Sequence, residues 1–89
     1  MSEPIVFAVF ERIPETNLGR LICVSAFYDG AFADADCSRE KGFAVCVRKI
    51  AVDEARENRM IPGAFTGIDW SELPGREIWP GWPVKEGEE

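Results

Sequence analysis

The distribution of apolar and polar residues predicts short strands in the first part of the chain. Two runs rich in β-branched and aromatic residues, over about 5–12 and 20–28, are typical of strands. Asp29-Gly30 follows the second run directly, and this pair favours the tight turn of a β-hairpin. A third strand is therefore predicted over 31–36, where small residues alternate with Phe and Asp. Together the three strands would form an antiparallel meander.

The next segment fits either a fourth strand or a helix. β-Branched residues over 43–50 are compatible with a strand. Four positions nevertheless have the i, i+3, i+4, i+7 spacing of one helix face: Phe43, Cys46, Val47 and Ile50. Ser38 is a suitable N-cap, and 53–59 consists largely of helix formers. We therefore predict a helix over 39–59.

The C-terminal third has a different amino-acid composition. Residues 61–83 contain four prolines, four glycines and all three tryptophans, a composition that favours extended structure. The acidic segment 84–89 is predicted to be a disordered end. The predicted fold class is α+β: a single domain over 1–83, with a three-stranded antiparallel sheet, one helix and an extended aromatic tail.

Both faces of the first two strands are apolar, whereas a sheet with one wet face alternates. One helix covers only one face, so something else must cover the other. The aromatic tail is the preferred cover, through these residues: Phe65, Trp70, Trp79 and Trp82. A second copy of the chain, or a partner in a groove lined by Trp79 and Trp82, are the alternatives.

Composition restricts the class of protein. Of 89 residues, 46% are hydrophobic, which suffices for a core in one small domain. We find no apolar run that could span a membrane and no signal peptide. There is no histidine, and the spacing of Cys23, Cys37 and Cys46 matches neither a zinc site nor a disulfide framework. We expect a cytoplasmic, non-enzymatic protein with reduced thiols, no catalytic residue, no metal and no cofactor.

Charge is unevenly distributed along the chain. The net charge of −6 argues against direct binding of duplex nucleic acid, which requires excess Lys and Arg. Residues 39–59 carry +2 and the remainder −8. On the predicted helix, five basic residues would share the side away from Phe43 and Ile50: Lys41, Arg48, Lys49, Arg56 and Arg59. This basic stripe is one candidate surface for an oriented contact with a partner protein.

Asp34 and Asp36 form the opposite candidate. On the predicted third strand they would share one face, as an acidic edge that could bind a partner. Paired carboxylates also suit Mg²⁺ or acid–base chemistry, so a small metal-binding or enzymatic domain is an alternative. A calcium loop is excluded because no Glu lies at the required distance.

Several short motifs resemble a type I-F anti-CRISPR protein from phages and mobile elements. The resemblance covers about 1–55 and rests on these features: Met1-Ser2-Glu3-Pro4-Ile5-Val6, the loop with Glu11, Pro14, Asn17 and Gly19, the Asp29-Gly30 pair, and an Ala-rich approach to one helix. It implies an inhibitor that binds a CRISPR complex or its nuclease in a bacterial host. Strong acidity in such proteins can imitate nucleic acid.

The function expected from the sequence is therefore that of a small acidic inhibitor. It would bind a host protein or protein–RNA complex stoichiometrically, as a monomer or homodimer. A homodimeric structural or phage-assembly accessory protein is the alternative of a different class.

Overall fold

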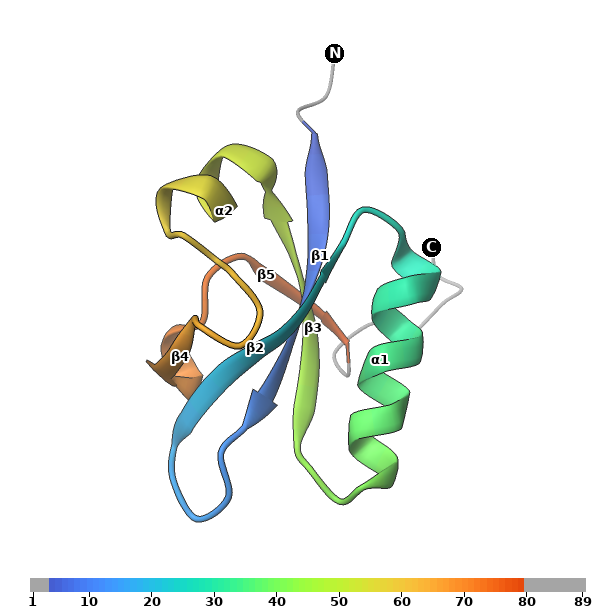
Figure 1. Cartoon of the computed structure of the whole chain (residues 1–89), viewed down its shortest axis with the longest axis vertical. Helices are drawn as coiled ribbons and strands as arrows, with labels where there is room; N and C mark the ends of the chain where they lie inside the picture. Colours follow the sequence, from blue (N-terminus) through green and yellow to red (C-terminus); the bar gives the residue numbers. More distant parts are fainter. Residues whose placement is uncertain (1–3, 80–89) are drawn as a thin grey trace.

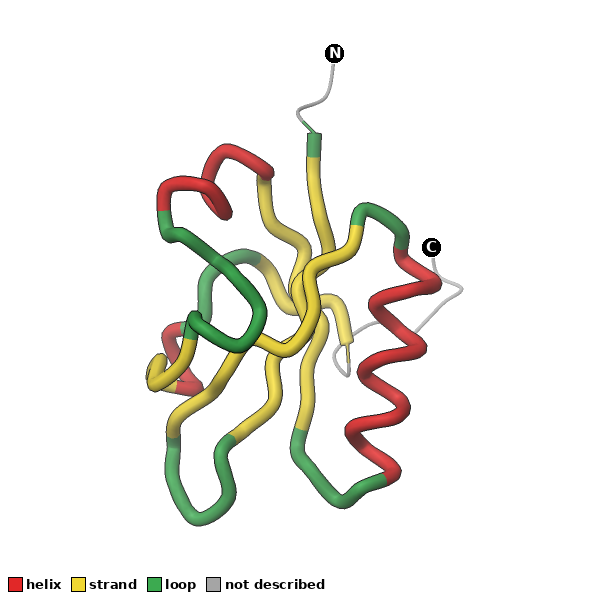
Figure 2. Tube along the Cα trace, viewed as in Figure 1, coloured by secondary structure: helices red, strands yellow, loops and turns green. Residues whose placement is uncertain are grey.

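A five-stranded antiparallel sheet with strand order β4-β2-β1-β3-β5 forms the centre of the structure, a computed structural model that describes residues 4–79 (Figure 1). Helices lie on both sides of this sheet (Figure 2). The elements in chain order are β1 (Ile5–Arg12), β2 (Leu18–Ser25), α1 (Tyr28–Glu40), β3 (Val45–Ala51), α2 (Val52–Glu57), β4 (Thr66–Asp69), the 3-10 turn η1 (Trp70–Glu72) and β5 (Arg76–Trp79). The predicted α+β class and antiparallel sheet are confirmed, but the sheet has five strands and not three.

The first two predicted strands are present, and the third is wrong. β1 has the predicted bounds, whereas β2 begins and ends slightly earlier than predicted. Residues 31–36 belong to α1, and Asp29-Gly30 lies in its first turn and not in a hairpin. Apolar residues recur there with helical spacing: Tyr28, Ala31, Phe32 and Ala35. The small size of the alanines makes this stripe easy to miss.

The predicted helix over 39–59 is also wrong. α1 ends at Glu40, β3 occupies the middle of the segment, and only α2 is helical in its last part. β3 lies inside the sheet, and Cys46 and Val47 are buried on opposite faces of it. A strand buried on both faces carries a nearly continuous apolar run, which here has the same spacing as a helix stripe.

α1 covers one face of the sheet. Its buried residues are Ala31, Ala35 and Ser38, and the alanines pack against Val9, Val45 and Val47. A β-bulge at Ile22 turns two consecutive residues, Ile22 and Cys23, toward this cluster. Trp79 also packs on the α1 side, and not on the opposite face that the aromatic tail was predicted to cover.

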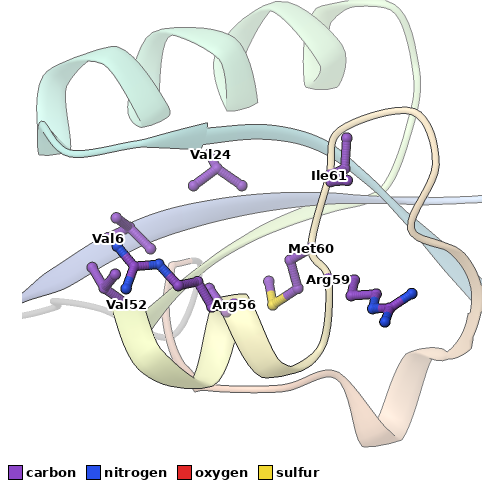
Figure 3. A pocket seen from close by; sticks show the side chains of 8 residues that line it. Val6, Val24, Val52, Arg56, Arg59, Met60 and Ile61 are labelled. Atoms are coloured by element: carbon purple, nitrogen blue, oxygen red, sulfur yellow. The ribbon is translucent and has the colours of Figure 1, made fainter.

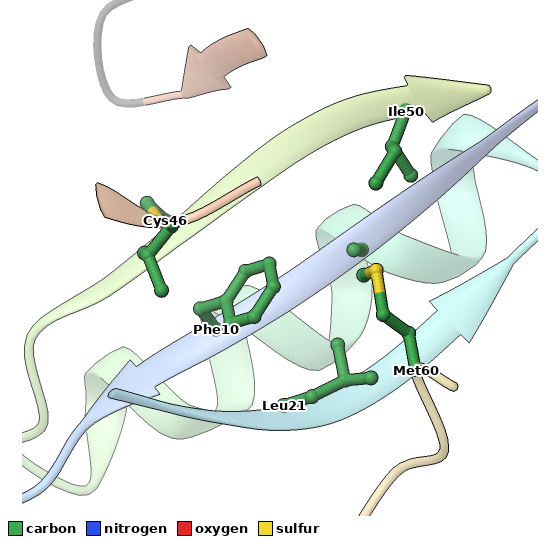
Figure 4. Packing of buried hydrophobic residues seen from close by; sticks show 7 residues of the cluster. Phe10, Leu21, Cys46, Ile50 and Met60 are labelled. Carbon is green, nitrogen blue, oxygen red and sulfur yellow. The ribbon is translucent and has the colours of Figure 1, made fainter. Parts of the chain in front are cut away.

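The second face is covered by α2, the loop after it and the η1 region. Its core contains Phe10, Leu21, Cys46, Ile50 and Met60 (Figure 4). Phe65 and Trp70 pack against this core, as predicted for the aromatic tail, although the tail also contributes two edge strands. Trp82 and the predicted disordered segment 84–89 lie outside the described residues.

Two glycines allow the C-terminal part of the chain to pack closely against the sheet. At Gly19 a Cβ atom would lie 2.8 Å from the Trp70 ring, so glycine lets this ring pack on β2. Gly75 has φ of 83°, and a Cβ there would lie 2.8 Å from the carbonyl oxygen of Lys49. Arg48 donates hydrogen bonds of 2.7 Å to the carbonyl oxygens of Pro74 and Gly75, which holds the start of β5 against β3.

Candidate functional site

A pocket of about 400 Å³ lies between α2 and the sheet (Figure 3). Its lining is mostly apolar and is formed by Val6, Val24, Val52, Ala55, Arg56, Arg59, Met60 and Ile61, which together are called the α2 pocket below. β1 and β2 supply one valine each. All the other lining residues come from α2 and the four residues after it.

Both basic residues of α2 and its extension line the pocket. Val52, Ala55 and Arg56 have the i, i+3, i+4 spacing of one side of α2, and the turn after the helix adds Arg59. The acidic residues of the same segment, Asp53, Glu54 and Glu57, are not among the lining residues. The chain thus presents a basic, apolar surface within a protein of net charge −6.

A residue in the left-handed conformation, Arg59, ends the helix at the edge of the pocket. Arg59 has φ of 53°, and the Met60 amide donates a 3.1 Å hydrogen bond to the Ala55 carbonyl oxygen. This geometry is typical of the residue after a helix C-cap, where glycine or asparagine is favoured. The turn buries the Met60 side chain and leaves Ile61 60% exposed.

The two arginines of the α2 pocket are unpaired within residues 4–79, where the ion pairs involve Arg20, Arg39 and Arg48. Their guanidinium groups point in opposite directions along the pocket (Figure 3). That of Arg56 lies toward Val6 and Val52, and that of Arg59 points away from them. The α2 pocket therefore combines an apolar floor with two separate cationic groups.

The predicted basic stripe is only partly assembled. Lys41 is the C-cap of α1, far along the chain from α2. Arg48 and Lys49 are neighbours on β3 and thus point to opposite faces of the sheet. Arg48 is engaged with β5, including a 3.6 Å ion pair to Glu77. Of the five predicted residues, only Arg56 and Arg59 share a site.

The acidic pair is not brought together. Asp34 and Asp36 are exposed, and in α1 a spacing of two residues places them roughly 200° apart around the axis. Asp36 lies 3.4 Å from Arg39, whereas Asp34 interacts with the thiol of Cys23. Within the described part of the chain, no group of three or more Cys, Asp or Glu side chains is placed to hold a metal ion.

Trp79 belongs to an aromatic cluster on the α1 side. Its ring lies 5.4 Å from the Phe32 ring in an edge-to-face arrangement, and the Arg39 guanidinium lies 5.4 Å from its centroid. This packing gives Trp79 a structural role in joining β5 to α1.

The environments of two cysteines keep their thiols protonated. Burial, reinforced by Asp34, raises the pKa of Cys23 to about 12. Burial also raises the pKa of Cys46 to about 12, against the opposing effect of Arg48. Since the thiolate is the reactive form, these environments make Cys23 and Cys46 poor nucleophiles at neutral pH.

Sequence reasoning missed a buried polar cluster at the end of α1. Glu11 on β1 is 7% exposed and accepts hydrogen bonds from the Ser38 hydroxyl and from Arg20 Nε, the latter at 2.8 Å. Arg20 pairs with Glu11 across the two strands, and its guanidinium lies 5.6 Å from the centroid of the Phe43 ring. The carboxylate is satisfied, so this cluster closes the core rather than offering a free site.

Sequence reasoning also did not identify the apolar residues of the α2 pocket as part of a binding site. Val6 and Val24 are ordinary strand residues, and only the fold brings them to Met60 and Ile61. The available signal was the apolar pair Met60-Ile61, which follows a polar run and precedes Pro62-Gly63.

Comparison of the chain with protein-family models, curated proteins and solved structures finds no match. Among the described residues, no helix has the length and apolar character required to cross a membrane.

Proposed function

We propose that this chain is a small non-enzymatic binding protein that acts by stoichiometric contact with another protein through the α2 pocket. One observation carries the proposal: an apolar depression of about 400 Å³ lies beside the 60% exposed side chain of Ile61. Apolar depressions of this size are typical of sites that receive a ligand or a partner side chain.

The energetics favour filling this site. Burying one partner side chain such as Leu or Phe contributes roughly 1.5–3 kcal/mol, and Ile61 would lose its exposed apolar area in the same step. Interfaces commonly depend on a few such anchors in well-packed pockets. The α2 pocket has this form, with an apolar centre and charged residues at its margin.

In its narrower form, the proposal is that the partner is a bacterial host defence complex and that binding blocks it in the cytoplasm. The support is the resemblance of residues 1–55 to anti-CRISPR inhibitors. The test is phage plating on a bacterium whose type I-F CRISPR system targets that phage. Expression of the wild-type chain should restore plaques, and unchanged immunity would refute this narrower form alone.

The general proposal is tested by affinity capture from a bacterial lysate with two matched variants. Ile61→Ser removes the exposed apolar side chain beside the pocket, whereas Leu18→Ser removes one that is 39% exposed at the start of β2. Both side chains are exposed, and the backbone hydrogen bonds of Ile61 do not depend on its side chain. Both variants should therefore fold.

We expect the wild-type protein and Leu18→Ser to retain the same stoichiometric partner, and Ile61→Ser to lose it. Circular dichroism verifies folding of all three proteins. Equal capture by both variants would show that the α2 pocket is not the contact surface.

A further inference from the structure

We infer that the α2 pocket recognises an extended acidic peptide segment in which an apolar side chain lies between two carboxylates. This inference rests on the proposed function and specifies the chemistry of the partner. The apolar side chain would occupy the floor, and the carboxylates would pair with Arg56 and Arg59.

The positions of the two arginines favour a peptide over a small amphipathic acid. Their guanidinium groups lie at different ends of the α2 pocket and point away from each other (Figure 3). A fatty acid has a single anionic head and could satisfy only one of them. An extended peptide presents residues i and i+2 on the same side, about 7 Å apart, so an acid–x–apolar–x–acid segment offers one carboxylate to each end.

The charge around the site supports the same assignment. Arg56 has an acidic residue at i−3, Asp53, yet no ion pair forms between them in the described structure. Both guanidinium groups therefore remain available to carboxylates, with which arginine forms strong charge-assisted hydrogen bonds. Since the chain as a whole carries −6 and repels acidic groups elsewhere, an acidic segment is favoured only where it reaches these two guanidinium groups, and this restriction orients it.

The backbone at Arg59 provides a clean test variant. Arg59 adopts a φ of 53°, which glycine adopts without the penalty that a side chain incurs. Arg59→Gly thus removes the charge while keeping the turn. Arg56→Ala keeps a strong helix former in α2. Arg12→Ala, at the exposed end of β1, is the matched control for loss of one positive charge.

The experiment is a selection from a random peptide display library on the folded wild-type protein, followed by fluorescence polarisation with the enriched peptides. We expect enriched sequences to contain an apolar residue with Asp or Glu two positions away on each side. Arg56→Ala and Arg59→Gly should each weaken binding about fivefold to tenfold, and Arg12→Ala less than about twofold. Affinity should fall as NaCl is raised.

The other outcomes separate the two proposals. Enrichment of neutral or basic peptides that still require Ile61 would overturn the inferred chemistry and leave the proposed function standing. If no peptide is enriched but decanoate shifts the NMR signals of the Val6 and Val24 methyl groups, the occupant is a small carboxylate, and the peptide inference is wrong. If peptides, decanoate and lysate proteins all fail to bind, both proposals are wrong.

Discussion

The two faces of the sheet are covered in different ways. One face lies under α1, a single helix of 13 residues whose buried positions are occupied by two alanines and a serine. The other lies under α2, a helix of six residues with no buried residue, and under the irregular chain that follows it. Small residues let α1 approach the strands closely, whereas the short helix leaves the α2 pocket open.

This difference in packing indicates which side of the sheet leaves side chains accessible to a partner. On the α1 side, the buried carboxylate of Glu11 has hydrogen-bond partners in Arg20 and Ser38. On the α2 side, two arginines and Ile61 remain accessible around apolar walls. The proposed contact surface therefore lies on the α2 side of the sheet, opposite the α1 side.

The largest effect is expected from Arg20→Ala, which tests the polar end of the α1 face. Arg20 lies 2.5 Å from the buried Glu11 carboxylate, and its loss leaves that charge without a cation. We expect the free energy of unfolding to fall by about 3 kcal/mol in urea denaturation. Arg56→Ala, which removes an unpaired arginine from the α2 face, should change it by less than about 0.5 kcal/mol.

A double variant identifies the cause of this loss. Glu11→Leu combined with Arg20→Ala removes the buried charge together with its partner and should recover more than half of the lost stability. If the double variant is no more stable than Arg20→Ala, the packing of the arginine side chain over Phe43 is responsible, and not the stranded carboxylate.

The same substitution on each face compares their packing directly. Ala35→Leu places a large side chain between α1 and the sheet, where Ala35 is 1% exposed, and should destabilise the protein by about 2 kcal/mol. Ala55→Leu extends into the α2 pocket, where space is available, and should change stability by less than about 0.5 kcal/mol. Urea denaturation measures both.

Ala55→Leu also links packing to recognition. A leucine at this position occupies part of the α2 pocket and should abolish partner capture in a fully folded protein. Equal destabilisation by the two leucines would show that the two faces are packed alike, contrary to the comparison.

The sequence predicts the α+β class and the first strand, but not the identity of the helices. β1 and β2 are recognisable because their β-branched and aromatic runs are interrupted by clear turn residues. α1 is not, since Ala31 and Ala35 contribute little hydrophobicity even though they are fully buried. β3 shows the opposite problem, because burial on both faces produces a run that also fits a helix.

The same errors in the predicted secondary structure explain why the predicted basic stripe and acidic edge do not form. The basic stripe depended on a helix over 39–59, so replacing most of that helix by β3 separates Arg48 and Lys49 from Arg56 and Arg59. The acidic edge depended on a strand over 31–36, and in α1 the two aspartates diverge. The α2 pocket joins Val6 and Val24 of the first two strands to residues within 52–61, and no local pattern encodes that proximity.

The smallest effect is the pH dependence of stability that arises at η1, which packs on the α2 side of the sheet. Asp69 caps η1, accepting hydrogen bonds of 2.9 Å from the Ser71 amide and 2.7 Å from the Ser71 hydroxyl. These hydrogen bonds lower the pKa of Asp69 below its ordinary value of 3.8. The ionised carboxylate therefore stabilises the folded state above pH 3.8, and this contribution is lost as the pH falls through the lower, folded-state pKa.

Asp69→Asn separates this contribution from general acid denaturation, because the amide oxygen still accepts a hydrogen bond but does not ionise. The wild-type protein should be slightly more stable than Asp69→Asn at neutral pH, and the difference should shrink below pH 3.8. Amide hydrogen exchange should report faster opening in acid around Trp70, which packs on the α2 face, while α1 stays protected. If the difference in stability between the wild-type protein and Asp69→Asn is constant from neutral to acid pH, the charge of Asp69 does not stabilise η1 against the sheet.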